Sequence, residues 1–143
     1  MNAAYIHITL NTIPPVLNIA GVVILLIGMM RANASVTRTG LFVLLFSALA
    51  GVPTFLSGEG AEEIVENMEG VNKRAIHPHE EAGEFTLIVM IVQAVAVVAA
   101  LIAPRRWLAV AALLIALVST ATVLRTAYLG GKIHHPETGV VSR

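Results

Sequence analysis

Four long runs of apolar residues, separated by short polar connections, constrain this sequence more than any other feature. They cover about residues 6–30, 37–57, 83–103 and 107–129. A helix needs about 20 mostly apolar residues to cross the hydrocarbon core of a bilayer. Because only helices and closed barrels satisfy their own backbone hydrogen bonds in lipid, runs of this length predict transmembrane helices. We therefore expect an all-α fold: a four-helix transmembrane bundle that forms a single integral membrane domain over residues 1–143.

The composition agrees with this class and excludes others. Hydrophobic residues make up 57% of the chain and charged residues only 13%, whereas a soluble domain carries about 25% charged residues. The lipid bilayer is therefore the first expected partner. A net charge of zero and the lack of any Lys/Arg block give no support to nucleic-acid binding. Since the chain has no cysteine, disulfides, thiolate nucleophiles and cysteine-ligated metal centres are excluded.

The charges predict the orientation of the bundle. The two short connections carry Arg31, Arg38, Arg105 and Arg106 and no acid. The opposite side carries as many basic residues, Lys73, Arg74, Lys132 and Arg143, but together with all nine glutamates, so the orientation rests on the short connections being purely basic. Short loops rich in Lys and Arg usually face the cytoplasm. We therefore expect both termini and the acidic connection to lie outside.

Polar and small residues follow one face of two of the runs, at alternating steps of three and four. In lipid such residues face other helices, so both stripes are expected to line the bundle interior. No internal repeat is evident between the two halves of the sequence. The stripes are His7, Asn11, Pro14, Asn18, Gly21, Leu25 and Gly28 in the first run, and His79, Gly83, Thr86, Met90, Gln93 and Val97 in the third. Pro14 and Pro15 are expected to bend the first helix.

The connection between the second and third runs is acidic. Residues 57–84 hold eight of the nine glutamates. Within this connection, about residues 59–68 predict a short amphipathic helix, which either continues the second span or lies along the interface. Glu59, Glu62, Glu63 and Glu66 share one face of it, where like charges repel and a bound cation would relieve the repulsion.

Histidines from three runs reach the same membrane level as these carboxylates. His7 begins the first run, His79 precedes the third, and His135 follows the Gly130–Gly131 pair, where the fourth helix is expected to end. Imidazole together with the carboxylates of Glu62 and Glu66 suits a transition metal ion such as zinc, iron or copper. Alternatively, two of the three histidines are the axial ligands of a haem b. The density of carboxylates and an aromatic content of 5% argue against haem.

Three segments resemble a family of bacterial four-span membrane proteins of unknown function. They read IHITLNTIPPVL, VPTFLSGEGAEEIVENMEGVNKRAIHPHEEAGE and TAYLGGKIHHPE, and together they follow the whole chain in order. Relatives are fused to Rieske-type or c-type cytochrome modules. The resemblance therefore implies electron transfer at the outer face of a bacterial inner membrane, with a periplasmic or membrane redox protein as partner. His135 matches the histidine of the family's Arg-His-Pro-Glu string, whereas Leu10, Asn11 and Thr12 replace its His-Phe-Pro.

Two function classes follow from these observations. The first is a membrane redox module with a metal or haem site made by His7, His79 and His135. The second is a non-catalytic membrane subunit or cation-handling protein that uses its acidic outer face to bind ions or a partner. A hydrolase is the least supported class, because Ser57 and Thr54 show no nucleophile pattern, and no catalytic residue is assigned.

Overall fold

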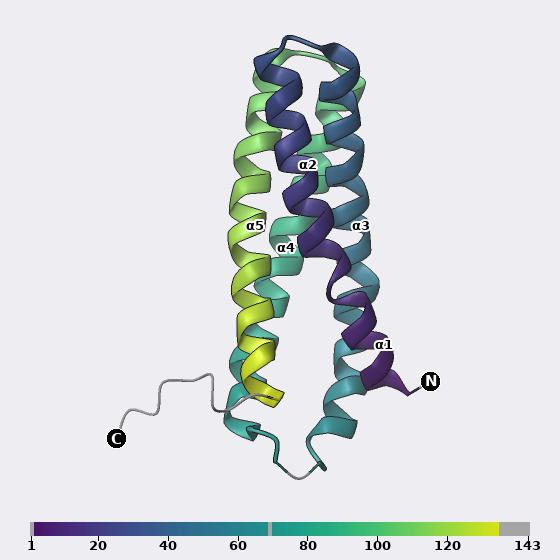
Figure 1. Ribbon diagram of the computed structural model, residues 1–143, viewed down its shortest axis with the longest axis vertical. Coiled ribbons are helices and arrows are strands. Elements are labelled where there is room, and N and C mark those ends of the chain that lie inside the picture. The colour runs from purple at the N-terminus through teal and green to yellow at the C-terminus, as the bar shows by residue number, and fades with distance from the viewer. Residues whose placement is uncertain (1, 69, 135–143) are drawn as a thin grey trace, which may run out of the picture.

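The structure is a computed structural model that describes residues 2–68 and 70–134. Its elements, in order, are helices α1 (Ala3–Leu10), α2 (Ile13–Met30) and α3 (Ala34–Val65), a 3-10 turn η1 (Lys73–Ala75), and helices α4 (Ile76–Ile102) and α5 (Arg106–His134). No strand occurs in these ranges. The helices form one elongated bundle, in which the start of α1 and the end of α5 lie at the same end (Figure 1). The predicted all-α four-helix bundle is therefore confirmed.

Four helical segments are long and apolar enough to cross a membrane. They are Ala3–Met30, Ala34–Val65, Lys73–Ile102 and Arg106–Ile133. The distribution of side chains is the reverse of that in a soluble bundle: Val16 and Val95 are about two-thirds exposed, while Asn18 and Gln93 are fully buried. Polar groups inside and large apolar groups outside are what a lipid environment favours. The chain is thus built to contact the bilayer with its apolar surface.

The first span bends where the prolines were expected to bend it. α1 ends at Leu10 and α2 begins at Ile13, and Pro14 lacks the N–H that would bond the carbonyl of Leu10 in a continuous helix. The hydroxyl of Thr54, on α3, lies 3.3 Å from that carbonyl and shares its hydrogen with the carbonyl of Ala50, at 2.8 Å. A side chain of the neighbouring helix therefore approaches the backbone group that the proline leaves without its helical partner.

Two boundaries refine the sequence predictions. Residues 59–68 were predicted to form a helix that either continues the second span or lies along the membrane interface. In the structure this helix continues the second span, because α3 runs without a break from Ala34 to Val65. The expected end of the fourth helix at Gly130 and Gly131 is wrong, since α5 passes through both glycines to His134. Gly130 has another use: a side chain there would collide with the imidazole of His79.

The two predicted polar stripes do line the interior. Their buried members are Pro14, Asn18, Gly21, Leu25 and Gly28 on α2, and Thr86, Met90, Gln93 and Val97 on α4. Small residues let α2 and α3 approach closely, because a Cβ at Gly40 would overlap the backbone of Leu25. Asn11, which the stripe also included, is exposed.

The helices of the second half of the bundle repeat those of the first half at a constant spacing in the sequence. This repeat was not evident from the sequence alone. His79 follows His7 by 72 positions (79 − 7), and the same spacing separates the last residues of α2 and α4, Met30 and Ile102. It also separates the first residues of α3 and α5, Ala34 and Arg106. Buried positions coincide in the same way. The buried pairs are Ala4 and Ile76, Pro14 and Thr86, Asn18 and Met90, Gly21 and Gln93, Leu25 and Val97, Gly28 and Ala100, Gly40 and Ala112, Leu44 and Ala116, Ser47 and Ser119, Gly51 and Val123, and Ala61 and Ile133.

The bundle is therefore two similar helical hairpins, α1–α3 and α4–α5, packed side by side. α3 packs on α4, and in the equivalent contact α5 packs on α2. A two-fold pseudo-axis along the bundle would exchange these two contacts, since it places each hairpin on the position of the other. Membrane proteins built from parallel repeats have such an axis. Most equivalent residues are both buried but are of different amino-acid types, so the similarity of the two hairpins is hidden in the sequence.

Candidate functional site

A large cavity opens at the acidic end of the bundle. Its volume is about 1240 Å³, and residues of all five helices line it. It extends from Glu62 and His77 at the rim to Met90 and Val123 at the floor. At this end α1 and α3 lie on one side, and α4 and α5 on the other (Figure 1). Typical small-molecule pockets measure about 300–1,000 Å³, so the cavity has room for a cofactor.

His7 lines this cavity from the first hairpin. Its Nδ1 lies 3.0 Å from the carbonyl oxygen of Thr54 and 3.0 Å from the hydroxyl of Ser57. The Ser57 hydroxyl itself donates to the same carbonyl at 2.8 Å. Because a carbonyl oxygen can only accept, the network assigns the proton of neutral His7 to Nδ1. The lone pair of Nε2 is then available to a ligand.

His79 lines the cavity from the second hairpin in the same manner. Its Nδ1 lies 3.0 Å from the carbonyl oxygen of Thr126 on α5, so Nδ1 again carries the proton. Gly130 lies against the ring: a Cβ at this position would be 2.9 Å from Cε1 of His79. The glycine therefore leaves the space that the imidazole fills.

Both histidines are held by the same local arrangement. Each donates from Nδ1 to the carbonyl of a threonine, and the glycine four residues after that threonine adjoins the ring. The threonine hydroxyl donates to the carbonyl three residues after the histidine. The partners are Thr54, Gly58 and Leu10 for His7, and Thr126, Gly130 and Ala82 for His79. All of these pairs follow the spacing of 72 residues, so the two imidazoles are equivalent under the pseudo-axis.

The two imidazoles face each other across the axis. Their centroids are 6.3 Å apart and their planes meet at 81°. Both side chains are half-buried, and no hydrogen bond to either Nε2 occurs within residues 2–68 and 70–134. A carbonyl that accepts from Nδ1, together with an unprotonated Nε2, is the usual arrangement of a metal-binding histidine. The two histidines are therefore the candidate residues for holding a ligand between the hairpins.

The carboxylates lie at the rim and do not surround the histidines. Glu62 lines the cavity, with its carboxyl beside that of Glu80 on the other hairpin. Glu66 follows the last residue of α3 and is exposed, so its predicted role as a metal ligand with the histidines finds no support in its position. His77 is also exposed, and its Nε2 lies 3.3 Å from Glu81.

The predicted ligands differ in where the structure places them. The structure brings His7 and His79 together, with Glu62 at the edge of the same cavity. His135, the third predicted histidine, lies outside the described residues. In the part of the chain that the structure describes, no group of three or more His, Cys, Asp or Glu side chains could hold a metal ion.

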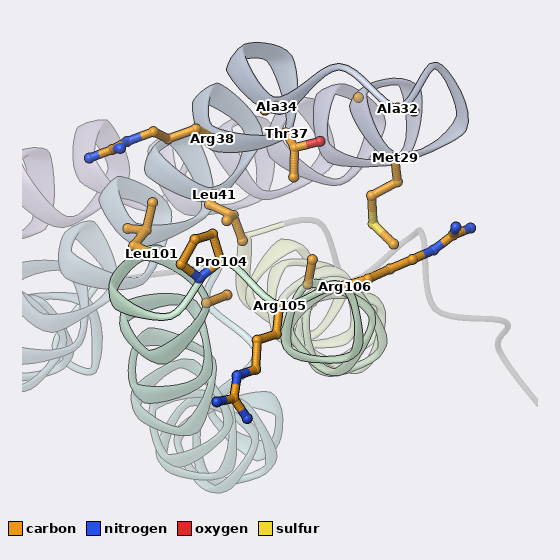
Figure 2. Close-up of a pocket in the computed structure, with 13 residues that line it drawn as sticks. Met29, Ala32, Ala34, Thr37, Arg38, Leu41, Leu101, Pro104, Arg105 and Arg106 are labelled. Carbon is orange, nitrogen blue, oxygen red and sulfur yellow. The ribbon is translucent and has the colours of Figure 1, made fainter.

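A second, smaller cavity of about 480 Å³ lies at the basic end of the bundle. Arg38, Arg105 and Arg106 border it, together with Leu41 and Pro104. Figure 2 shows the three guanidinium groups pointing away from one another and out of the cavity. They do not converge on a common anion, so we assign no function to this cavity.

Sequence reasoning missed the residues that orient the histidines. Thr54 and Ser57 were considered only as nucleophiles, and Gly130 only as a helix terminator. The one available signal was the recurrence of a Thr-x-x-x-Gly pattern, Thr54 to Gly58 and Thr126 to Gly130, at the spacing that also separates His7 from His79.

No protein-family model, curated protein or solved structure matches this chain. The resemblance to a bacterial four-span family therefore stays a prediction from the sequence, and the geometry of the cavity carries the functional argument.

Proposed function

We propose that this chain is a membrane redox protein in which His7 and His79 would hold one haem b. The supporting observation is the pair of equivalent imidazoles, 6.3 Å apart, with each Nδ1 bonded to a carbonyl. Bound haem would supply one-electron chemistry at the acidic end of the bundle. The protein would supply the two ligands and their orientation.

The position of the two rings supports a shared ligand. Their centroids are only 6.3 Å apart, and they come from different hairpins. Because each Nδ1 is bonded to a carbonyl, each Nε2 is the nitrogen that would hold the group.

Haem would need no third side chain. The described residues bring two histidines together, and His135, the third predicted ligand, lies outside them. A porphyrin provides four nitrogens itself, so two histidines suffice. A transition metal ion held by His7, His79 and His135 is the alternative, and metal analysis separates the two.

The carbonyl partners have a defined role in this proposal. A hydrogen bond from Nδ1 to the carbonyl of Thr54 or Thr126 fixes the rotation of each ring and makes Nε2 a stronger electron donor to a metal. The support is not identical, because Nδ1 of His7 also lies 3.0 Å from the hydroxyl of Ser57, whereas the equivalent residue beside His79 is Leu129.

The proposed orientation places this site at the outer, periplasmic face of a bacterial inner membrane. The connections at the other end hold Arg31, Arg38, Arg105 and Arg106, and basic connections favour the cytoplasmic side. Electrons would then be exchanged with a periplasmic or membrane redox protein at the acidic rim.

The absorption spectrum of the purified protein tests the cofactor. If the protein is isolated without haem, titration with hemin serves the same purpose. We expect a Soret band at roughly 410–430 nm, as for six-coordinate histidine-ligated haem. His7→Ala and His79→Ala should each remove or shift it, because each takes away one axial ligand. His77→Ala is the matched control: this exposed histidine is two positions from His79 and should leave the spectrum unchanged.

Two other results would lead to different conclusions. The protein could instead contain one metal ion per chain and show no Soret band. If this ion were lost on chelation and in His79→Ala, a metal site would replace haem in the proposal. If neither haem nor metal bound, the redox proposal would be refuted. The carboxylates at the rim, Glu62 and Glu80 among them, would then be better explained as a surface that binds cations or a basic partner.

A further inference from the structure

A ring of buried polar side chains crosses the middle of the bundle. Asn18 donates from Nδ2 to the carbonyl of Ala116 at 3.0 Å, and its Oδ1 accepts from Ser47 at 3.2 Å and from Gln93 at 2.8 Å. Ser119, on α5, is fully buried like the other three ring residues. Among the described residues, two side-chain atoms of this ring have no partner: Oε1 of Gln93 and Oγ of Ser119.

The repeat shows which interaction is missing. Asn18 reaches the carbonyl of Ala116, and Gln93 reaches the carbonyl of Leu44 at 2.9 Å. Leu44 and Ala116 are equivalent residues, so the two amides make equivalent bonds from non-equivalent positions. In the first hairpin, the one hydroxyl hydrogen of Ser47 is shared between the carbonyl of Pro14, at 2.9 Å, and the amide oxygen of Asn18, at 3.2 Å. In the second hairpin, the counterparts of this hydroxyl and this amide oxygen are the hydroxyl of Ser119 and the amide oxygen of Gln93, and these are the two atoms without a partner among the described residues.

The orientation of the Gln93 amide follows from its neighbours. Nε2 lies between two acceptors, Oδ1 of Asn18 and the carbonyl of Leu44. Exchanging N and O would place an oxygen against both of them. Oε1 is therefore a true acceptor, and burying it without a hydrogen-bond partner costs about 1–3 kcal/mol. Buried polar atoms without a protein partner commonly bind an ordered water.

We propose that a water molecule binds between Gln93 and Ser119 in the middle of the bundle, and that it exchanges only with the acidic end. The water would donate to Oε1 of Gln93 and accept from the hydroxyl of Ser119. It would thereby complete the half of the ring in which no direct bond is made. This proposal does not depend on the cofactor, because none of the ring residues lines the cofactor cavity.

The route to the acidic end is short. Pro14, Gly51, Met90 and Val123 form the floor of the large cavity, and each lies three or four residues from a ring member. Met90 covers the path: a Cβ at Gly51 would lie 2.7 Å from its Sδ. Methionine is flexible and changes rotamer readily, so it can act as a gate.

The route to the basic end is closed. Above the ring the interior is filled by a cluster of apolar residues, each at most 5% exposed, with no polar side chain among them. This cluster consists of Leu25, Leu41, Leu44, Val97, Ala100, Ala112 and Ala116. Close-packed apolar interiors hold no water. Exchange from this side would require the packed core itself to open.

Labelling of single cysteines tests the asymmetry, since the chain has no cysteine of its own. A small charged thiol reagent is added to one side of membranes at a time, and Asn72→Cys and Ser35→Cys report the acidic and basic sides. We expect Ser119→Cys to react from the acidic side only. Met90→Ala should speed this reaction by about tenfold, which corresponds to 1.4 kcal/mol of opening free energy. Val97→Cys, in the apolar cluster, should stay unreacted from both sides.

Each alternative outcome overturns the proposal. No reaction of Ser119→Cys from either side would mean that water does not reach the ring, and equal reaction from both sides would mean that the apolar cluster does not seal it. Repeating the measurement in His79→Ala ensures that a bound cofactor does not block the path. A density map of the unaltered protein that resolves ordered water is a second measurement. It should show a peak between Gln93 and Ser119, and a map without one would refute the bound water.

Discussion

Replacing Gly130 by alanine should have two opposing effects on stability: a gain in helix propensity and a steric clash with His79. In a helix, Gly→Ala is favourable by about 0.5–1 kcal/mol, because alanine has less backbone freedom to lose on folding. At Gly130, however, the new Cβ would lie 2.9 Å from Cε1 and 3.2 Å from Nδ1 of His79. Carbon atoms prefer about 3.5–4.0 Å, so the imidazole must retreat by roughly half an ångström or more.

This retreat acts on the hydrogen bond that holds the ring. The bond from Nδ1 of His79 to the carbonyl of Thr126 is 3.0 Å long, which is close to the most common length of an N–H···O bond, so any retreat of the ring weakens it. Lengthening it costs about 1–3 kcal/mol in a half-buried site, which exceeds the gain in helix propensity. We therefore expect Gly130→Ala to lower the free energy of unfolding by up to about 2 kcal/mol and to weaken haem or metal binding.

Gly131→Ala is the internal control. No heavy atom within residues 2–68 and 70–134 lies within 4 Å of a Cβ at this position. This variant should therefore gain up to about 1 kcal/mol from helix propensity alone and bind the cofactor normally.

Reversible unfolding in mixed micelles measures both variants, and ¹⁵N spectra of the imidazoles report the proton on Nδ1. Equal stabilisation by the two alanines, with the Nδ1 signal of His79 unchanged, would refute the close packing of Gly130 on the histidine and its role in the site.

The remaining predictions concern packing, strain and orientation. Gly40→Ala should destabilise the protein by about 1–3 kcal/mol in the same unfolding assay, because its Cβ would overlap the backbone of Leu25 and force α2 and α3 apart. Ala32→Gly should stabilise it by about 1 kcal/mol, since Ala32 has a φ of +49°, a left-handed conformation that costs a residue with a Cβ roughly that amount. A stability unchanged by either substitution would contradict the corresponding contact or strain. In intact cells, Asn72→Cys should react with an impermeant reagent and Ser35→Cys should be protected; the reverse pattern would invert the proposed orientation.

Local properties of the sequence determined the four helices and their interior faces. Hydropathy located the spans because burying apolar residues in lipid depends on composition and length, not on partners. Periodicity placed Asn18 and Gln93 inside because residues at steps of three and four share one face of any helix. The double proline likewise predicted the bend before α2, since a missing N–H is a property of the residue itself. His7 and His79 could be expected at one end of the bundle for the same reason: antiparallel spans bring their ends to common levels.

Only the tertiary structure decided what holds these residues. Hydrogen bonds from His7 to Thr54 and from His79 to Thr126 depend on the rotation and height of one helix against another, which no local pattern encodes. The Gly130–Gly131 pair predicted a helix end, but α5 continues through both residues, and only the structure shows that Gly130 leaves the space for the imidazole of His79. The repeat also remained hidden, because packing conserves which positions are buried and leaves the identity of most side chains free. Asn18 and Gln93 make equivalent bonds from positions that do not correspond, so only their three-dimensional contacts relate the two halves of the chain.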